Sequence, residues 1–162
     1  MPYDILESEI QHFIPALLEW FESHRADLPW RRTNNPYHSW LSEIMLQQTQ
    51  ITTVIPYYER FLERFPTIES LAVAPQDDLM KQWEGLGYYS RARNLQTAAK
   101  QVVEDYGGQI PQTAKELQKL MGIGRYTAGA IASIAFGQTA SILDGNVIRV
   151  FTRLLDIEDD IR

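Results

Sequence analysis

Two carboxylates stand alone in long uncharged stretches of this sequence. Glu43 is the only side chain ionised at neutral pH in residues 33–58, and Asp144 is the only one in residues 126–148. Uncharged stretches of this length are typical of buried segments. A carboxylate in such a segment must find a partner or keep its proton to a higher pH. The two residues therefore indicate acid–base chemistry.

The elements that must position these carboxylates are predicted to be helices. Apolar residues recur every three or four positions, and no segment sustains the alternation typical of a strand. We therefore predict an all-α fold. Glu43 is expected on a helix that begins at Asn35-Pro36, and Asp144 is expected at the start of a helix over residues 145–156. The other predicted helices cover residues 7–23, a segment around 57–65, and residues 67–73, 75–83, 90–105, 113–120 (opened by a capping box at Thr113 and Glu116) and 125–136.

Composition narrows the class of protein. The chain has 162 residues, of which 44% are hydrophobic, so it can bury a proper core. It has no basic–apolar leader and no run of about 18 apolar residues, so we expect a cytoplasmic protein without a membrane segment. It has no cysteine and therefore offers no disulfide and no thiolate ligands. The net charge of −6 argues against a generally basic nucleic-acid surface, so any DNA binding must depend on a local patch and on backbone amides.

Two glycines separate two predicted helices in the segment Leu120-Met121-Gly122-Ile123-Gly124-Arg125. Glycine lets backbone approach a ligand closely, and the free amides at a helix start form an anion site. A DNA phosphate fits such a site. A tight turn beside a close-packed Ala/Gly helix face is the alternative interpretation.

This segment resembles the hairpin of the helix-hairpin-helix DNA glycosylase superfamily, and Asp144 matches the aspartate of its Gly/Pro-Asp signature. Met121 departs from the pattern, in which proline is usual at that position. The resemblance implies that Gly122, Gly124 and Arg125 contact DNA. It also implies a monovalent cation at the hairpin, bound by the backbone carbonyls of Gln118, Leu120 and Ile123.

Four longer segments resemble adenine DNA glycosylases of the MutY type, which remove adenine mispaired with 8-oxoguanine. They are residues 28–31, 40–50, 85–95 and 142–147. The resemblance implies a six-helix barrel with its hairpin in residues 28–136, and a catalytic aspartate loop and following helix in residues 137–162. Residues 1–27 would be the N-terminal helix of a second helical domain that this chain contains only in part.

The same resemblance implies that the chain is the N-terminal part of a longer protein. Relatives of this type usually add an iron–sulfur cluster and a Nudix-like domain. We expect a monomeric bacterial protein associated with the nucleoid, whose partner is double-stranded DNA carrying adenine opposite 8-oxoguanine or guanine. No cofactor is expected within residues 1–162 apart from the hairpin cation.

The resemblance also assigns roles to single residues. Glu43 would protonate adenine and then help to activate water, and Asp144 would stabilise or transiently bond to the oxocarbenium carbon. Both could instead be structural, as a helix-surface glutamate and as an N-cap. Tyr126 would orient the sugar and Asn146 would orient Asp144. The base pocket would contain Trp30, Arg31 and Leu46, and the residues at the duplex would be Gln48, Thr49, Leu86, Gly87 and Tyr88.

Position 126 bears on the type of reaction. In relatives that also cleave the strand, a lysine at this position forms a Schiff base. Tyr126 cannot do so, which predicts a monofunctional glycosylase. The alternatives are a thymine-mismatch glycosylase of the same superfamily and a noncatalytic mismatch-binding module. The candidate phosphate contacts are Arg91, Arg93, Arg125, Arg149 and Arg153.

Overall fold

The computed structural model describes residues 3–157, and it describes side chains from residue 11 onward. Every regular element in this range is helical, which confirms the all-α prediction. The elements in chain order are α1 (Tyr3–His24), the short 3₁₀ helix η1 (Pro29–Arg31), α2 (Pro36–Leu46), α3 (Ile51–Arg64), α4 (Ile68–Ala72), α5 (Gln76–Trp83), α6 (Ser90–Tyr106), α7 (Ala114–Leu117), α8 (Arg125–Phe136) and α9 (Gly145–Leu154).

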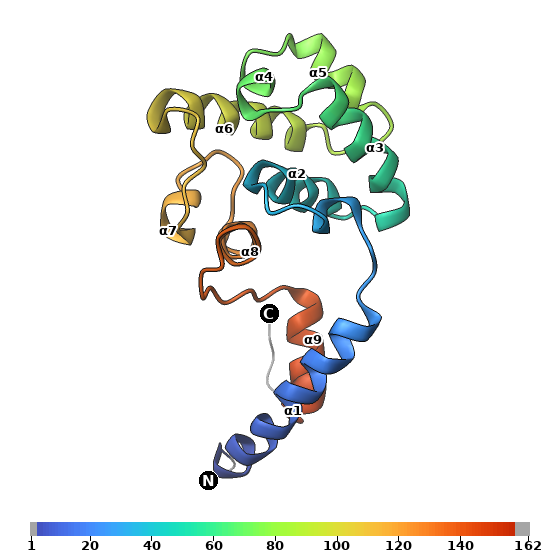
Figure 1. Cartoon of the computed structure of the whole chain (residues 1–162), viewed down its shortest axis with the longest axis vertical. Coiled ribbons are helices and arrows are strands. Elements are labelled where there is room, and N and C mark those ends of the chain that lie inside the picture. Colours follow the sequence, from blue (N-terminus) through green and yellow to red (C-terminus); the bar gives the residue numbers. More distant parts are fainter. Residues whose placement is uncertain (1–2, 158–162) are drawn as a thin grey trace.

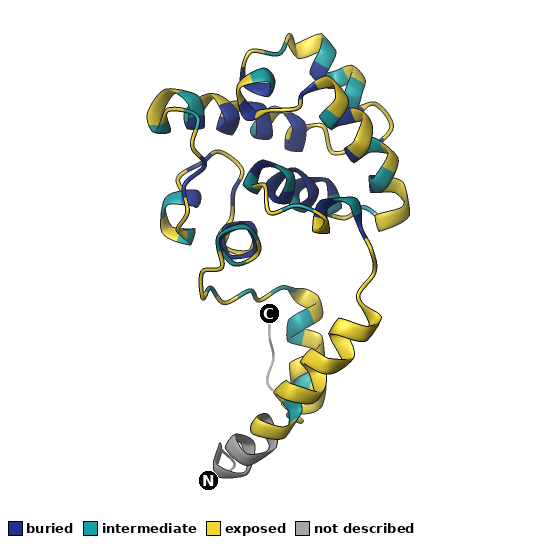
Figure 2. Cartoon of the chain, viewed as in Figure 1, coloured by how far each residue is buried: buried dark blue, intermediate teal, exposed yellow. Residues whose placement is uncertain are grey.

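The helix α2 runs through the middle of the helical body. It packs against α3 and α6 on one side and against α8 on the other, and Figure 1 shows this arrangement. Trp40, Leu41 and Met45 of α2 are fully buried, and α2 is the most continuously buried helix in Figure 2. Glu43 therefore lies on the helix that forms the centre of the core.

Local signals explain where α2 and α6 begin and end. The Asn35 side chain accepts a hydrogen bond from the backbone N–H of Tyr37 at 2.9 Å, and Pro36 occupies the first position of α2. Gly107 ends α6 in the left-handed conformation at φ +60°. Both boundaries agree with the sequence prediction, because each depends on residues within one turn.

The predicted capping box at Thr113 is only half formed. Thr113 accepts from the backbone N–H of Glu116, but the Glu116 carboxylate pairs with Lys119 at 2.8 Å. The helix also ends at Leu117 instead of residue 120, because the following residues tighten into a 3₁₀-type turn in which the Leu120 N–H donates to the Leu117 carbonyl. A complete capping box occurs instead at the start of α4.

The helices α1 and α9 lie outside this body, as Figures 1 and 2 show. The sequence places an apolar stripe on α1, formed by Ile10, Phe13, Ile14, Leu17, Leu18 and Phe21. This stripe is largely exposed from residue 13 onward, and the side chain of Ile10 lies outside the described residues. Leu18, for example, retains 59% of its accessible surface. No helix in the described part of the chain is long and apolar enough to cross a membrane. The division at residues 27 and 136 stays a prediction.

Candidate active site and DNA-facing surface

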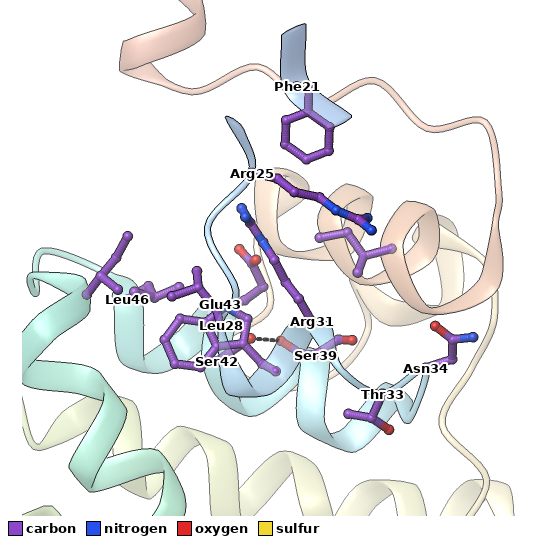
Figure 3. A pocket seen from close by; sticks show the side chains of 13 residues that line it. Phe21, Arg25, Leu28, Arg31, Thr33, Asn34, Ser39, Ser42, Glu43 and Leu46 are labelled. Atoms are coloured by element: carbon purple, nitrogen blue, oxygen red, sulfur yellow. Dashed lines mark hydrogen bonds between the residues drawn. The ribbon is translucent and has the colours of Figure 1, made fainter. Parts of the chain in front are cut away.

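Glu43 lines a cavity of about 360 Å³ between α2, the 3₁₀ helix and the end of α1. Trp30, Arg31 and Leu46, the residues predicted to form a base pocket, line the same cavity. Figure 3 shows that Glu43 and Arg31 extend toward the same part of it. The volume lies within the range of about 300–1,000 Å³ that is usual for small-molecule sites. The structure thus brings the predicted pocket residues together.

The electrostatics of Glu43 differ from those of a surface glutamate. Burial raises the pKa of its carboxyl group, and hydrogen bonding with the Tyr126 hydroxyl partly offsets this rise. Burial also raises the pKa of Tyr126, and the negative charges of Glu43 and Asp144 raise it further. The Tyr126 hydroxyl group therefore lies within electrostatic range of both carboxylates. Residues from α2, α8 and the N-cap of α9 therefore come within electrostatic range of one another, although they lie far apart in the sequence.

Both oxygens of Asp144 are held in place. Its Oδ1 accepts from the backbone N–H of Val147 at 2.8 Å and caps α9, and its Oδ2 accepts from Asn146 Nδ2 at 3.3 Å. Asn146 is fixed in turn by Arg149, which donates to its Oδ1 at 3.2 Å. The capping interpretation of Asp144 is therefore correct, and the cap also fixes the direction in which the carboxylate points. Asn146 thus contacts Asp144, and its orienting role in catalysis stays a prediction.

A close backbone approach holds the loop that carries Asp144 against α8. A Cβ atom on Gly129 would lie 3.0 Å from the carbonyl oxygen of Ser141, which is tighter than nearly all real Cβ contacts. Gln47 Nε2, just after the end of α2, also lies 3.5 Å from Thr127 Oγ1 of α8. The small residues at the start of α8 thus let α2, α8 and the 137–144 loop meet around Tyr126.

The walls of the cavity combine structural and site roles. Trp30 is buried, and its ring meets the Tyr58 ring edge-on at a centroid distance of 5.3 Å. Arg31 is exposed at the rim, where it donates to the Ala26 carbonyl at 3.1 Å and lies over the Phe21 ring. Trp30 is therefore both a core aromatic and a wall of the cavity, whereas Arg31 is held at the rim by local contacts.

Sequence reasoning missed two serines that line the cavity. Ser39 and Ser42 precede Glu43 by four and one positions on α2, and both are buried. Ser42 Oγ donates to the Ser39 carbonyl at 2.8 Å, as the dashed line in Figure 3 marks. Their small size on the Glu43 side of an otherwise bulky helix was the signal that could have found them.

The predicted hairpin joins α7 to α8 through a turn that requires glycine. Gly122 has a φ of +75°, and a Cβ atom there would lie 2.7 Å from the Cβ of Asn94. Met121, which departs from the family pattern, donates its backbone N–H to Gln101 Oε1 at 2.8 Å. This bond explains how the turn keeps its place on α6 without a proline. Gly124 begins α8 without a side-chain cap, so no side chain occupies the amides of the first turn, where Arg125 is exposed.

Two expected DNA-facing residues lie inside the protein. Arg91 is only 8% exposed, and its guanidinium donates to backbone carbonyls instead of facing solvent as a phosphate contact. Leu86 is also buried, at 6% exposure, because its side chain belongs to the core. Gln48 and Tyr88 are exposed, as expected, and Thr49 and Gly87 are partly buried beside them.

No group of three or more His, Cys, Asp or Glu side chains among residues 11–157 could hold a metal ion. At the hairpin, the Leu120 carbonyl already accepts from the Ile123 N–H at 3.1 Å. A carbonyl oxygen has a second lone pair, so this bond leaves room for a cation.

Comparison with known proteins agrees with the fold. Residues 41–161 match the family described as HhH-GPD superfamily base excision DNA repair protein, and the chain belongs to this family. Among curated proteins, it is 49% identical to adenine DNA glycosylase of Homo sapiens over 94% of the chain and 30% of that protein. It is 48% identical to adenine DNA glycosylase of Rattus norvegicus over 98% of the chain and 33% of that protein.

The chain therefore spans about a third of the length of these curated relatives. Among solved structures, a thermostable thymine-DNA glycosylase superposes with a TM-score of 0.85 at 31% identity. That comparison covers 91% of this chain and 68% of the other. The fold is thus that of the DNA glycosylases of this superfamily.

Proposed function

We propose that the protein hydrolyses the N-glycosidic bond of adenine mispaired with 8-oxoguanine or guanine, as a monofunctional DNA glycosylase. The observation that carries the proposal is that the Tyr126 hydroxyl group interacts both with Glu43, which lines the cavity, and with Asp144. Burial raises the pKa of the Glu43 carboxyl group, and the Asp144 carboxylate is fixed by two hydrogen bonds. The similarity to adenine DNA glycosylases supports adenine as the base.

The chemistry follows from these two environments. Protonated Glu43 donates its proton to the five-membered ring of adenine, so that the electron pair of the C–N bond leaves with a neutral base. Positive charge develops on the sugar, where the Asp144 carboxylate stabilises it. Deprotonated Glu43 then accepts a proton from the water that attacks the sugar carbon. Tyr126 supplies a hydroxyl group between the two carboxylates, and it cannot form a Schiff base.

The DNA surface would extend from this site over three segments. Gly122, Gly124 and Arg125 offer backbone amides and one exposed positive charge to a phosphate. Gln48 and Tyr88 offer exposed side chains that could enter the duplex and replace the extruded adenine. We place the working location of the protein at the bacterial chromosome.

The chain's own residues bear on two bound groups, a monovalent cation at the hairpin and an iron–sulfur cluster. The carbonyl oxygens of Gln118, Leu120 and Ile123 are suitable ligands for a monovalent cation, which would hold the hairpin against a phosphate. Residues 1–162 contain no cysteine, so they offer none of the thiolates that usually bind an iron–sulfur cluster.

One observation favours a second candidate. The similarity to a thymine-DNA glycosylase covers 91% of the chain at 31% identity, so thymine mispaired with guanine is the alternative substrate. The similarity to adenine DNA glycosylases is higher, at 48–49% identity, and it favours adenine.

A panel of three duplexes distinguishes these candidates. The full-length protein is incubated with DNA containing adenine opposite 8-oxoguanine, adenine opposite guanine, or thymine opposite guanine, and the released base is measured by chromatography. We expect adenine from the first two duplexes and no thymine from the third. Release of thymine alone would establish the alternative, and release of neither base would favour a noncatalytic binding module.

A further inference from the structure

One buried arginine joins the two loops that carry Gln48 and Tyr88. Arg91 Nη1 donates to the carbonyls of Ile44 and Met45, both at 2.9 Å, and to that of Gln47 at 2.8 Å. Arg91 Nη2 lies 3.2 Å from the carbonyl of Gly87 and at longer range from two further acceptors, Leu86 O at 3.3 Å and Thr49 Oγ1 at 3.4 Å. A single guanidinium therefore contacts the end of α2 and both loops.

These contacts surround the two exposed residues. The acceptors on Gln47 and Thr49 lie immediately before and after Gln48, and those on Leu86 and Gly87 lie immediately before Tyr88. The Arg91 guanidinium also lies 5.5 Å from the centre of the Tyr88 ring, which nevertheless stays 62% exposed. The guanidinium thus fixes the backbone on which each exposed side chain stands.

The backbone of both residues is strained. Gln48 has a φ of +55° and Tyr88 a φ of +46°, in a region that non-glycine residues rarely adopt. Only one other non-glycine residue in the described part of the chain, Asp156, has a positive φ. Such conformations persist when the surrounding structure enforces them, and they are frequent at functional sites.

We infer that Arg91 is a positioning residue that holds Gln48 and Tyr88 as one rigid unit, which displaces the mismatched base from the duplex. This inference rests on the proposed function, because it takes mismatched DNA as the substrate. Arg91 is buried and does not touch DNA, so its contribution is to extrusion of the base and not to cleavage of the bond. Lysine at this position keeps the charge but cannot span acceptors on three segments.

The test compares a paired substrate with one whose base is already unpaired. In the full-length protein, Arg91→Lys and Arg91→Gln are assayed on adenine opposite 8-oxoguanine and on adenine within a small bubble. Lys100→Gln, which removes an exposed charge from the same helix, is the matched control. Thermal unfolding shows whether each variant is folded. A 2-aminopurine placed next to the mismatch reports extrusion whether or not the bond is cleaved.

We expect both Arg91 variants to lose about tenfold or more in extrusion and excision on the paired substrate. On the bubble substrate, the excision rates of both Arg91 variants should lie within about twofold of that of the unaltered protein. The control Lys100→Gln should lie within the same range on both substrates. In a background that carries Gln48→Ala and Tyr88→Ala, Arg91→Lys should cause little further loss.

Equal loss on the paired and bubble substrates would overturn the inference, because it would indicate a general structural role. No loss on either substrate, or full additivity with the double alanine background, would also overturn it. If the unaltered protein excises no adenine, the proposed function fails. The 2-aminopurine signal still decides whether Arg91 controls extrusion.

Discussion

Replacing Glu43 with glutamine separates catalysis from stability at this site. Glutamine keeps the size of the side chain but cannot give a proton to adenine, so the general-acid contribution is lost. A positioned acid contributes about 100-fold to 10,000-fold in rate, which corresponds to about 2.7–5.4 kcal/mol of transition-state stabilisation. Because the cavity walls do not depend on the charge of Glu43, DNA binding should stay nearly unchanged.

Although Glu43→Gln slows excision, the same substitution should favour the folded state at neutral pH. Burial raises the pKa of Glu43 in the folded protein, so the native state binds this proton more tightly than the unfolded chain does. The resulting stabilisation is fully present below the unfolded pKa of about 4.3 and is lost as pH rises through the folded pKa. Glutamine does not titrate. The stability of Glu43→Gln relative to the unaltered protein should therefore increase with pH. The increase is about 1.4 kcal/mol for each tenfold difference in the proton affinity of Glu43 between the folded and the unfolded state.

The assay is single-turnover excision with excess enzyme, combined with urea unfolding at pH 4 and pH 7.5. Glu63→Gln on α3 is the matched control, because Glu63 is exposed. Near-normal excision by Glu43→Gln would refute the general-acid role. A relative stability that falls between pH 4 and pH 7.5 would refute the account of its environment.

Four further predictions follow from the site and its surroundings. Asp144→Ala should abolish excision and lower the unfolding free energy by about 1 kcal/mol, because the cap of α9 is lost. Asp144→Asn should excise poorly but keep most of the stability. Urea unfolding, measured beside excision, separates the two effects. Gly122→Ala should lower stability by about 1 kcal/mol or more and weaken DNA binding, because the positive φ and the nearby Asn94 leave no room for a Cβ atom, and unchanged unfolding would contradict this. The net charge of −6 predicts a shallow dependence of mismatch affinity on salt, and a slope as steep as that of a highly basic DNA-binding protein would be inconsistent with it. Residues 1–162 alone should show weak hydrogen-exchange protection over residues 11–23, where the apolar stripe is exposed; protection equal to that of α8 in a monomer would contradict this.

Helix boundaries that depend on residues within one or two turns were predictable from the sequence. The start of α2 at Asn35-Pro36, the bounds of α8 and the left-handed end of α6 all depend on such residues. The isolation of Glu43 in an uncharged stretch also predicted its environment, because the rest of the fold largely buries that stretch. The stretch around Asp144 does not follow this expectation, since residues 133–148 are exposed or only partly buried.

Features that depend on distant contacts were not predictable in this way. Arg91 has the sequence context of a solvated arginine, yet residues more than 40 positions away supply carbonyls that satisfy it inside the protein. The capping box at Thr113 is half formed for a local reason, since Lys119, three positions later, pairs with the Glu116 carboxylate. The cavity serines were missed because their signal is their small size beside Glu43 on α2 and not a distinctive spacing.

The most direct test of the central claim follows one labelled strand that carries adenine opposite 8-oxoguanine. The full-length protein is incubated with this duplex, and the strand is analysed before and after treatment with alkali. A hydrolytic enzyme with tyrosine at position 126 should release adenine and leave an intact strand that breaks only after alkali. Breakage before alkali, or a covalent adduct trapped by borohydride, would contradict the assignment of the chemistry to Glu43 and Asp144.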